Sequence, residues 1–188
     1  MDWKTNILTT HDQVRQLLQN TKTIAVLGIK PETHAGQPAY YVPKYMADAG
    51  YDIIPVPVYY PEVTEILGRP VYRDLSEIPG EIDLLNVFRR SEDIPKHTLE
   101  ILAKKPKAVW FQLGIRNDEV AQRLAEAGIK VVQDLCLMVE HRAMSFISGR
   151  IESSRSHLFE THRVLFRSTG GERRRRGVYR RPGRWRRA

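Results

Sequence analysis

Short apolar runs alternate with segments of helical periodicity over residues 22–142, and this alternation limits the possible folds most strongly. The runs are apolar at mostly consecutive positions, which is typical of strands covered on both faces by helices. Alternating strands and helices build a parallel α/β sheet. We predict an α/β fold, a doubly wound, mainly parallel five-stranded sheet in the order 3-2-1-4-5. The expected strands are residues 23–28, 51–54, 82–88, 108–112 and 129–133.

Two helices are expected in the first part of the chain. A leading helix over residues 11–20 carries Val14, Leu17 and Leu18 on one face. A second helix, starting near Ala39, would place Pro43 in the first turn. The first four backbone donors of a helix have no intrahelical acceptor, so the proline would remove only an unused donor.

Polar residues mark the starts of two later helices. Ser91 is expected to cap a helix that buries Ile94, Thr98 and Ile101, because serine is a favoured N-cap residue. Asn117 is expected to begin another helix, which Gly128 ends.

Basic residues follow two of the predicted strands, at the edge where such sheets bind ligands. Gly28 permits a tight turn, and backbone N–H groups after it can hold phosphate oxygens. Lys30 adds a point charge, while Arg89 and Arg90 offer planar, multidentate donors. The alternative is that these are ordinary solvated loop charges. Taken together, the turn at Gly28 and the three basic residues favour a nucleotide with several phosphates as the ligand.

The same edge lacks two features of dinucleotide-binding enzymes. The first strand is followed by a single glycine rather than G-x-G-x-x-G, and no acid ends the second strand to bind a ribose hydroxyl. A small NAD(P)-linked reductase is therefore the weaker alternative function.

Two long stretches, residues 26–90 and 108–141, resemble the small stand-alone CoA-binding proteins of bacteria. Blocks such as "NVFRR", "WFQLGI" and "DLCLMVEH" carry the resemblance. It implies a Rossmann-type domain similar to that of the succinyl-CoA synthetase α chain, with coenzyme A as cofactor. The CoA-contacting residues that it implies are Gly28, Ile29, Lys30, Val56, Pro57, Val58, Phe88, Arg89, Arg90, Gln112, Gly114 and Ile115.

The chain departs from the family pattern at one turn and lacks one domain. It has Val56-Pro57-Val58 where the family often has "VNP", so a side-chain contact there is in doubt. The residues after 142 do not resemble the phosphohistidine domain of acyl-CoA synthetases. We therefore expect non-enzymatic binding of CoA or an acyl-CoA, used by an unidentified protein partner.

The single cysteine, Cys136, has two possible roles. An exposed thiolate beside His141 would be a candidate nucleophile. The apolar context "LCLMV" favours core packing next to the ligand instead. No metal-ligand spacing or catalytic triad is present, so no catalytic or metal-binding residue is predicted.

The excess positive charge is confined to the end of the chain. From Arg150 onward there are 13 Arg and 3 Glu, a balance of +10 against +8 for all 188 residues, which leaves −2 for the preceding part. We expect three segments: an N-terminal helix in residues 1–21, a CoA-binding domain at 22–142, and a disordered or non-native Arg-rich tail at 143–188. Tyr179 and Trp185 among its arginines make nucleic-acid binding through the tail an alternative function.

The sequence contains few features that indicate the cellular compartment of the protein. One cysteine excludes an internal disulfide, which fits a reducing compartment. The first ten residues lack a basic start followed by an apolar run, and no apolar stretch is long enough for a membrane span. A soluble, cytoplasmic protein is expected.

Overall fold

A computed structural model describes residues 2–144 of the chain. The predicted disorder and nucleic-acid binding of the tail concern residues that lie almost wholly outside this range.

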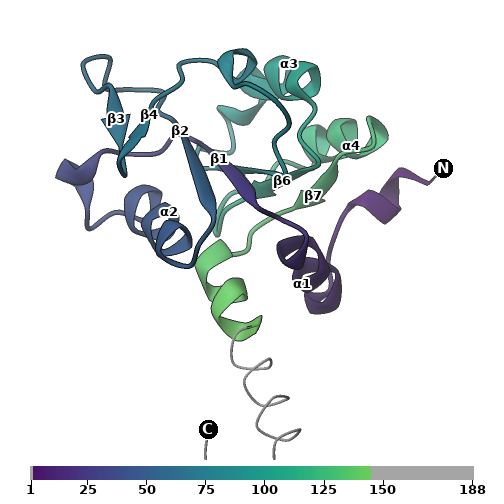
Figure 1. The fold of residues 1–188 in the computed structure, drawn as a ribbon. Coiled ribbons are helices and arrows are strands. Elements are labelled where there is room, and N and C mark those ends of the chain that lie inside the picture. Colours follow the sequence, from purple (N-terminus) through teal and green to yellow (C-terminus); the bar gives the residue numbers. More distant parts are fainter. Residues whose placement is uncertain (1, 145–188) are drawn as a thin grey trace, which may run out of the picture. The chain divides into compact units, whose positions relative to one another are not determined.

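The core of the described part is a five-stranded, all-parallel sheet (Figure 1), which confirms the predicted α/β class. The order is β2-β1-β5-β6-β7, so the third predicted strand pairs with the first and not with the second. The predicted order 3-2-1-4-5 is wrong. The strands are β1 (Thr23–Leu27), β2 (Asp52–Val56), β5 (Leu84–Val87), β6 (Ala108–Phe111) and β7 (Lys130–Val132).

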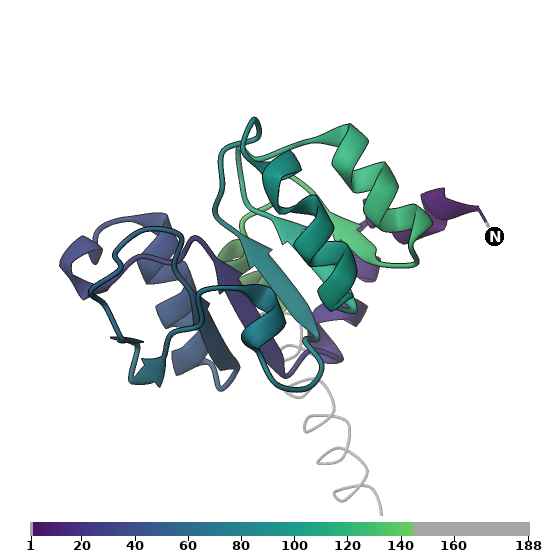
Figure 2. The same ribbon diagram turned by 90° about the horizontal axis from the view of Figure 1, so that it is seen from above.

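A small hairpin lies on the outer side of β2, where the predicted order would place β5. Strands β3 (Glu65–Ile66) and β4 (Arg69–Pro70), which the sequence analysis missed, lie beside β2 at the sheet edge away from β7 (Figure 2). The Tyr72 N–H donates to the Pro55 carbonyl at 2.9 Å, and Arg69 pairs with Asp52 at 2.8 Å. The outer edge of β2 is therefore occupied, and the chain crosses to the other side of β1.

Helices cover both faces of the sheet (Figure 1). One face carries α1 (His11–Gln19), α2 (Pro38–Asp48) and a helix over residues 137–144; the other carries α3 (Ile94–Lys104) and α4 (Asp118–Glu126). Each face buries its own apolar cluster, with Met46 and Trp110 in one and Ile101 and Phe111 in the other. Within residues 2–144, no helix is both long and apolar enough to cross a membrane. Three 3-10 helices complete the elements: η1 (Trp3–Asn6), η2 (Glu32–His34) and η3 (Leu75–Glu77).

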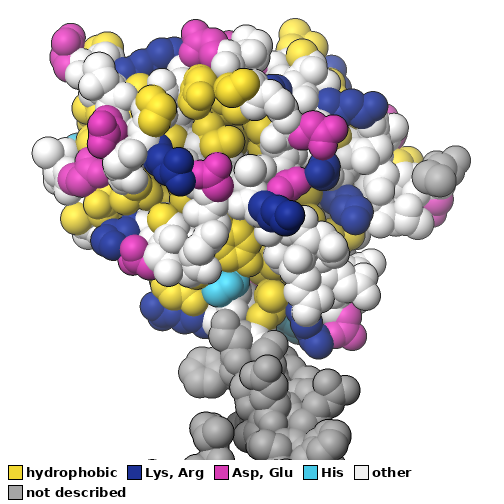
Figure 3. Space-filling view, in the orientation of Figure 1, with side chains coloured by type: hydrophobic (Ala, Val, Ile, Leu, Met, Phe, Trp, Pro, Cys, Tyr) yellow, Lys and Arg dark blue, Asp and Glu magenta, His cyan; other side chains and the backbone are white. Residues whose placement is uncertain are grey.

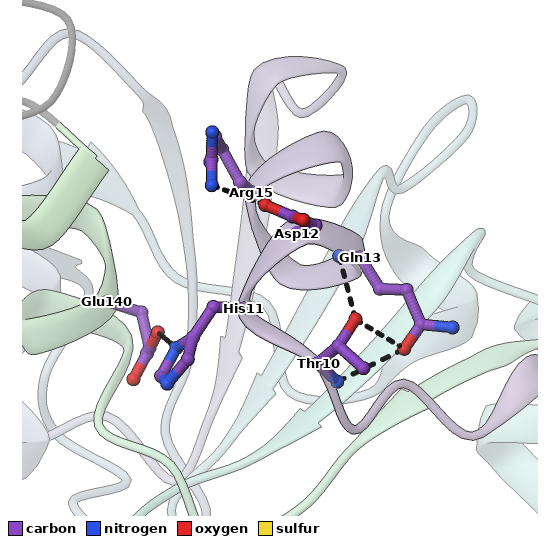
Figure 4. A network of polar contacts seen from close by, with 6 residues as sticks. All are labelled: Thr10, His11, Asp12, Gln13, Arg15 and Glu140. Atoms are coloured by element: carbon purple, nitrogen blue, oxygen red, sulfur yellow. Dashed lines mark hydrogen bonds and ion pairs between the residues drawn. The ribbon is translucent and has the colours of Figure 1, made fainter.

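The predicted starts of α1 and α4 are confirmed. Helix α1 buries Val14, Leu17 and Leu18 as expected, and Thr10 and Gln13 form a reciprocal cap at its start (Figure 4). The Asn117 side chain accepts from the Val120 N–H at 3.0 Å and begins α4, as predicted.

Ser91 does not cap α3, so that prediction is wrong. The helix begins three residues later, at Ile94, after a turn. The Ser91 hydroxyl accepts from the Arg116 N–H at 3.2 Å instead, joining the loops that follow β5 and β6.

Pro43 lies deeper in α2 than predicted. Helix α2 begins at Pro38, so Pro43 is its sixth residue and removes a hydrogen bond that the helix would otherwise make to the Ala39 carbonyl. That carbonyl accepts from the Lys30 N–H at 3.1 Å. Pro43 thus leaves the Ala39 carbonyl free to accept a hydrogen bond from the loop between β1 and α2.

Candidate functional site

A pocket of about 560 Å³ opens at the carboxyl ends of β1, β5 and β6. This place is where ligands bind in open α/β sheets, beside the point at which the strand order reverses. The pocket is lined by the three strand-end loops, the start of α2 and the segment after β7. Its lining is Lys30, Gln37, Pro38, Ala39, Tyr41, Val42, Phe88, Arg89, Arg90, Ser91, Glu92, Gln112, Leu113, Gly114, Ile115 and Cys136.

The loop after β1 is held close to the loop after β5. Gly28 has φ +88°, and a Cβ at this position would lie 2.6 Å from the Phe88 carbonyl oxygen. Only glycine fits this approach. Ile29 is buried beneath the loop, and the Lys30 ammonium donates to the Gln37 side chain at the start of α2.

Arg89 is the most buried cationic side chain of the pocket. It is 10% exposed, pairs with Asp93 at 3.4 Å, and its guanidinium carbon lies 5.2 Å from the Tyr59 ring centroid. Its buried Nε has no hydrogen-bond partner among the described residues. A hydrogen bond from Lys96 and the positive charges of the neighbouring arginines lower the pKa of Asp93, which keeps this carboxylate ionised beside Arg89.

Arg90 lies in a different environment from Arg89. Its side chain is 82% exposed at the mouth of the pocket, with Glu92 4.0 Å away. The two neighbouring arginines therefore present one buried donor and one exposed charge to the same cavity.

Behind the pocket, a buried amide pair joins β5 to β6. The Gln112 side chain donates to Asn86 at 2.8 Å and accepts from the Leu137 N–H at 3.4 Å. The Nδ2 of Asn86 is buried without a partner in the described part of the chain. Gln112 thus fixes both the end of β6 and the start of the helix over residues 137–144.

The loop after β6 is fixed by the loop after β7. The Asp134 carboxylate accepts from the Gly114 N–H at 2.7 Å, and the Asp134 N–H donates to the Ile115 carbonyl at 3.2 Å. Gly114 and Ile115 border the pocket as a result.

The predicted residues after β2 lie in a second hollow. Val56 is buried, whereas Pro57 and Val58 line a cavity of about 440 Å³ with Tyr59 and Arg73. The structure therefore brings seven of the twelve predicted residues into one pocket: Lys30, Phe88, Arg89, Arg90, Gln112, Gly114 and Ile115. Arg89 links the two hollows, because it lines the first and its guanidinium stacks on Tyr59 of the second.

The sequence analysis did not name the side chains at the start of α2 that line the pocket. Gln37, Ala39 and Tyr41 line the pocket although no strand precedes them directly. Their position follows from the packing of α2, which the Lys30 to Ala39 hydrogen bond helps to set. Leu113 lines the pocket as well, and it is 68% exposed at the mouth.

Cys136 lines the main pocket, whereas His141 lies beside Tyr45. Cys136 is half-buried and lines the pocket. His141 Nδ1 lies 3.0 Å from the Tyr45 hydroxyl, and burial lowers the pKa of this histidine below its ordinary value of 6.5.

The family of the chain follows from a comparison with protein-family models. The model described as "CoA binding domain" matches residues 22–142. The chain belongs to the CoA-binding domain family. The resemblance seen in the sequence is thereby confirmed.

Relatives of this CoA-binding domain include proteins from bacteria and archaea. The uncharacterized protein YneT of Bacillus subtilis (strain 168) is 41% identical over 129 residues, 69% of this chain and 92% of that protein. Cell-free ID.343 from Thermus thermophilus is 39% identical with a TM-score of 0.66, over 72% of this chain and 99% of that chain. A hypothetical protein from Pyrococcus horikoshii OT3 is 32% identical with a TM-score of 0.65, over 72% and 92%.

Proposed function

We propose that this chain binds coenzyme A or an acyl-CoA without transforming it, and that the nucleotide phosphates lie against the loops after β1 and β5. The buried Arg89, whose Nε has no hydrogen-bond partner within residues 2–144, is the observation that carries this proposal. A buried polar group without a partner costs free energy, and an anionic oxygen at this place would offset the cost.

The surrounding donors suit a phosphorylated nucleotide. Lys30 and Arg90 add positive charge on either side of Arg89, from two loops that Gly28 allows to meet. Guanidinium groups bind phosphate through several parallel hydrogen bonds. Glu92 also lines this mouth, but it lies beside Arg90, which offsets its charge.

The two hollows suit the two ends of CoA. The hollow with Pro57, Val58 and Tyr59 offers apolar and aromatic surface to the adenosine. The main pocket, with Tyr41, Val42 and Ile115 among its lining, offers apolar surface to the pantetheine arm. Arg89 would hold the phosphates between them.

Calorimetric titration of CoA into the full-length protein tests the proposal. We expect micromolar or tighter binding of CoA, and much weaker binding of NAD and NADP. Replacing Arg89 with Gln should weaken CoA binding about 10- to 100-fold, because a charge-assisted hydrogen bond contributes about 1.5 to 3 kcal/mol.

Arg15→Gln is the matched control. Arg15 pairs with Asp12 on α1 (Figure 4) and lies outside the pocket, so this variant should bind CoA as the wild type does. Equal affinity in the wild type and the Arg89 variant would contradict the assigned phosphate site. No CoA binding by the wild type would overturn the function itself.

The face of the described residues that Figure 3 shows gives no support to nucleic-acid binding. On the face shown in Figure 3, basic side chains alternate with acidic ones, and neither sign forms a continuous patch. The arginine clusters on which the nucleic-acid alternative depends lie in residues 150–188, outside the described residues.

A further inference from the structure

Cys136 is presented to the main pocket on a fixed stretch of backbone. The carbonyl of Leu135, just before it, accepts from the Trp110 indole N–H at 2.7 Å. The N–H of Leu137, just after it, donates to Gln112 at 3.4 Å. The half-buried sulfur of Cys136 is thereby held at the pocket wall.

The same cavity holds Arg89, whose guanidinium pairs with Asp93 only through a terminal nitrogen. Arg89 is nine-tenths buried, lines the pocket that Cys136 lines, and leaves its Nε unsatisfied among the described residues. This group points to an anionic ligand independently of the cysteine. A ligand anchored there by phosphates, with a flexible arm ending in sulfur, would place two sulfur atoms in one cavity.

We propose that Cys136 forms a mixed disulfide with coenzyme A by exchange with CoA disulfide. This inference rests on the proposed function. The Cys136 thiolate attacks one sulfur of CoA disulfide, whose S–S bond breaks as the bond between Cys136 and CoA forms. The second CoA leaves as a thiolate and takes up the proton that Cys136 released. The thiol is oxidised and one half of CoA disulfide is reduced, so no other oxidant is required.

Incubation of the reduced full-length protein with CoA disulfide tests this exchange, with intact-mass spectrometry as the readout. Pantethine is the matched probe, because it carries the same sulfur arm without the nucleotide. We expect the adduct to form at least about tenfold faster with CoA disulfide, since binding raises the effective concentration of the sulfur. Excess acetyl-CoA should slow the reaction, and dithiothreitol should reverse it.

The Arg89→Gln variant distinguishes a reaction of bound CoA disulfide from a reaction by random collision with Cys136. This variant should slow the reaction with CoA disulfide and leave the reaction with pantethine unchanged. Equal rates for the two disulfides in the wild type, or no adduct at all, would overturn the inference.

Calorimetric titration of CoA into the Cys136→Ser variant distinguishes failure of the mixed-disulfide inference from failure of the proposed CoA binding. CoA binding by Cys136→Ser, together with no adduct on the wild type, would reject the mixed disulfide and leave CoA binding intact. No CoA binding by either chain would reject both.

Discussion

At the scale of single residues, the contact between Gly28 and Phe88 controls the shape of the site. Replacing Gly28 with Ala adds a Cβ 2.6 Å from the Phe88 carbonyl oxygen at a backbone φ of +88°. The β5 loop must move, and Arg89 moves with it. We expect the free energy of unfolding to fall by about 2 to 4 kcal/mol, with weaker CoA binding, measured by urea unfolding and calorimetry.

Gly50→Ala is the control for backbone strain alone. Gly50 has φ +97°, and a Cβ there meets nothing within 4 Å. This variant should lose only about 1 kcal/mol and keep its CoA affinity. If both variants lost the same stability and both kept CoA binding, the close approach at Gly28 would not matter to the site.

At the scale of elements, Asp83 ties the starts of neighbouring strands together. Its carboxylate accepts from the N–H groups of Lys22 and Thr23, at 2.9 and 3.1 Å, and from the Lys107 ammonium at 2.8 Å. Burial acts to raise the pKa of Asp83, but the Lys107 ammonium and the two backbone donors outweigh it and lower the pKa to about 2.

Asp83→Asn should destabilise the protein by about 1 to 3 kcal/mol near neutral pH. The pKa of Asp83 in the folded state lies below its ordinary value of 3.8, so its stabilisation is complete above that value and is lost as the pH falls through about 2. The difference between wild type and variant should shrink over this range, measured by urea unfolding at several pH values.

Asp12→Asn is the matched control for Asp83. Asp12 is 80% exposed in its pair with Arg15, and exposed ion pairs contribute little. It should change the free energy of unfolding by less than about 1 kcal/mol. A constant difference between wild type and Asp83→Asn from neutral to acid pH would contradict the ionic role of Asp83.

At the scale of the whole molecule, the main pocket and the excess charge belong to different parts of the chain. The residues that line the main pocket fall between Lys30 and Cys136, whereas residues 150–188 carry 13 Arg and 3 Glu. Deleting residues 150–188 should change the CoA dissociation constant by no more than about twofold at physiological salt, which weakens long-range attraction between an Arg-rich segment and an anionic ligand.

Calorimetry of the shortened and full-length chains, at low and at physiological salt, measures this effect. A large loss of CoA affinity on deletion would show that the tail takes part in the site. Salt-sensitive DNA binding that the full chain shows and the shortened chain lacks would support the alternative function of the tail.

The sequence alone determined the class of fold and predicted much of the lining of the main pocket. Local patterns carry this information: consecutive apolar residues indicate strands buried on both faces, as in β5, and Asn117 begins α4 because its side chain caps the helix. Residues that directly follow strands share one edge of a parallel sheet, which is why Lys30, Arg89 and Gln112 lie together.

Only the tertiary structure decided the order of the strands and the complete wall of the pocket. Strand order depends on which edge of β2 is free, and the β3–β4 hairpin occupies that edge through contacts that a local pattern does not encode. The approach of α2 depends on the Ala39 carbonyl, which Pro43 frees for Lys30. The burial of Arg89 and the exposure of Arg90, two identical neighbours in the sequence, likewise arise from packing against Tyr59 and Asp93.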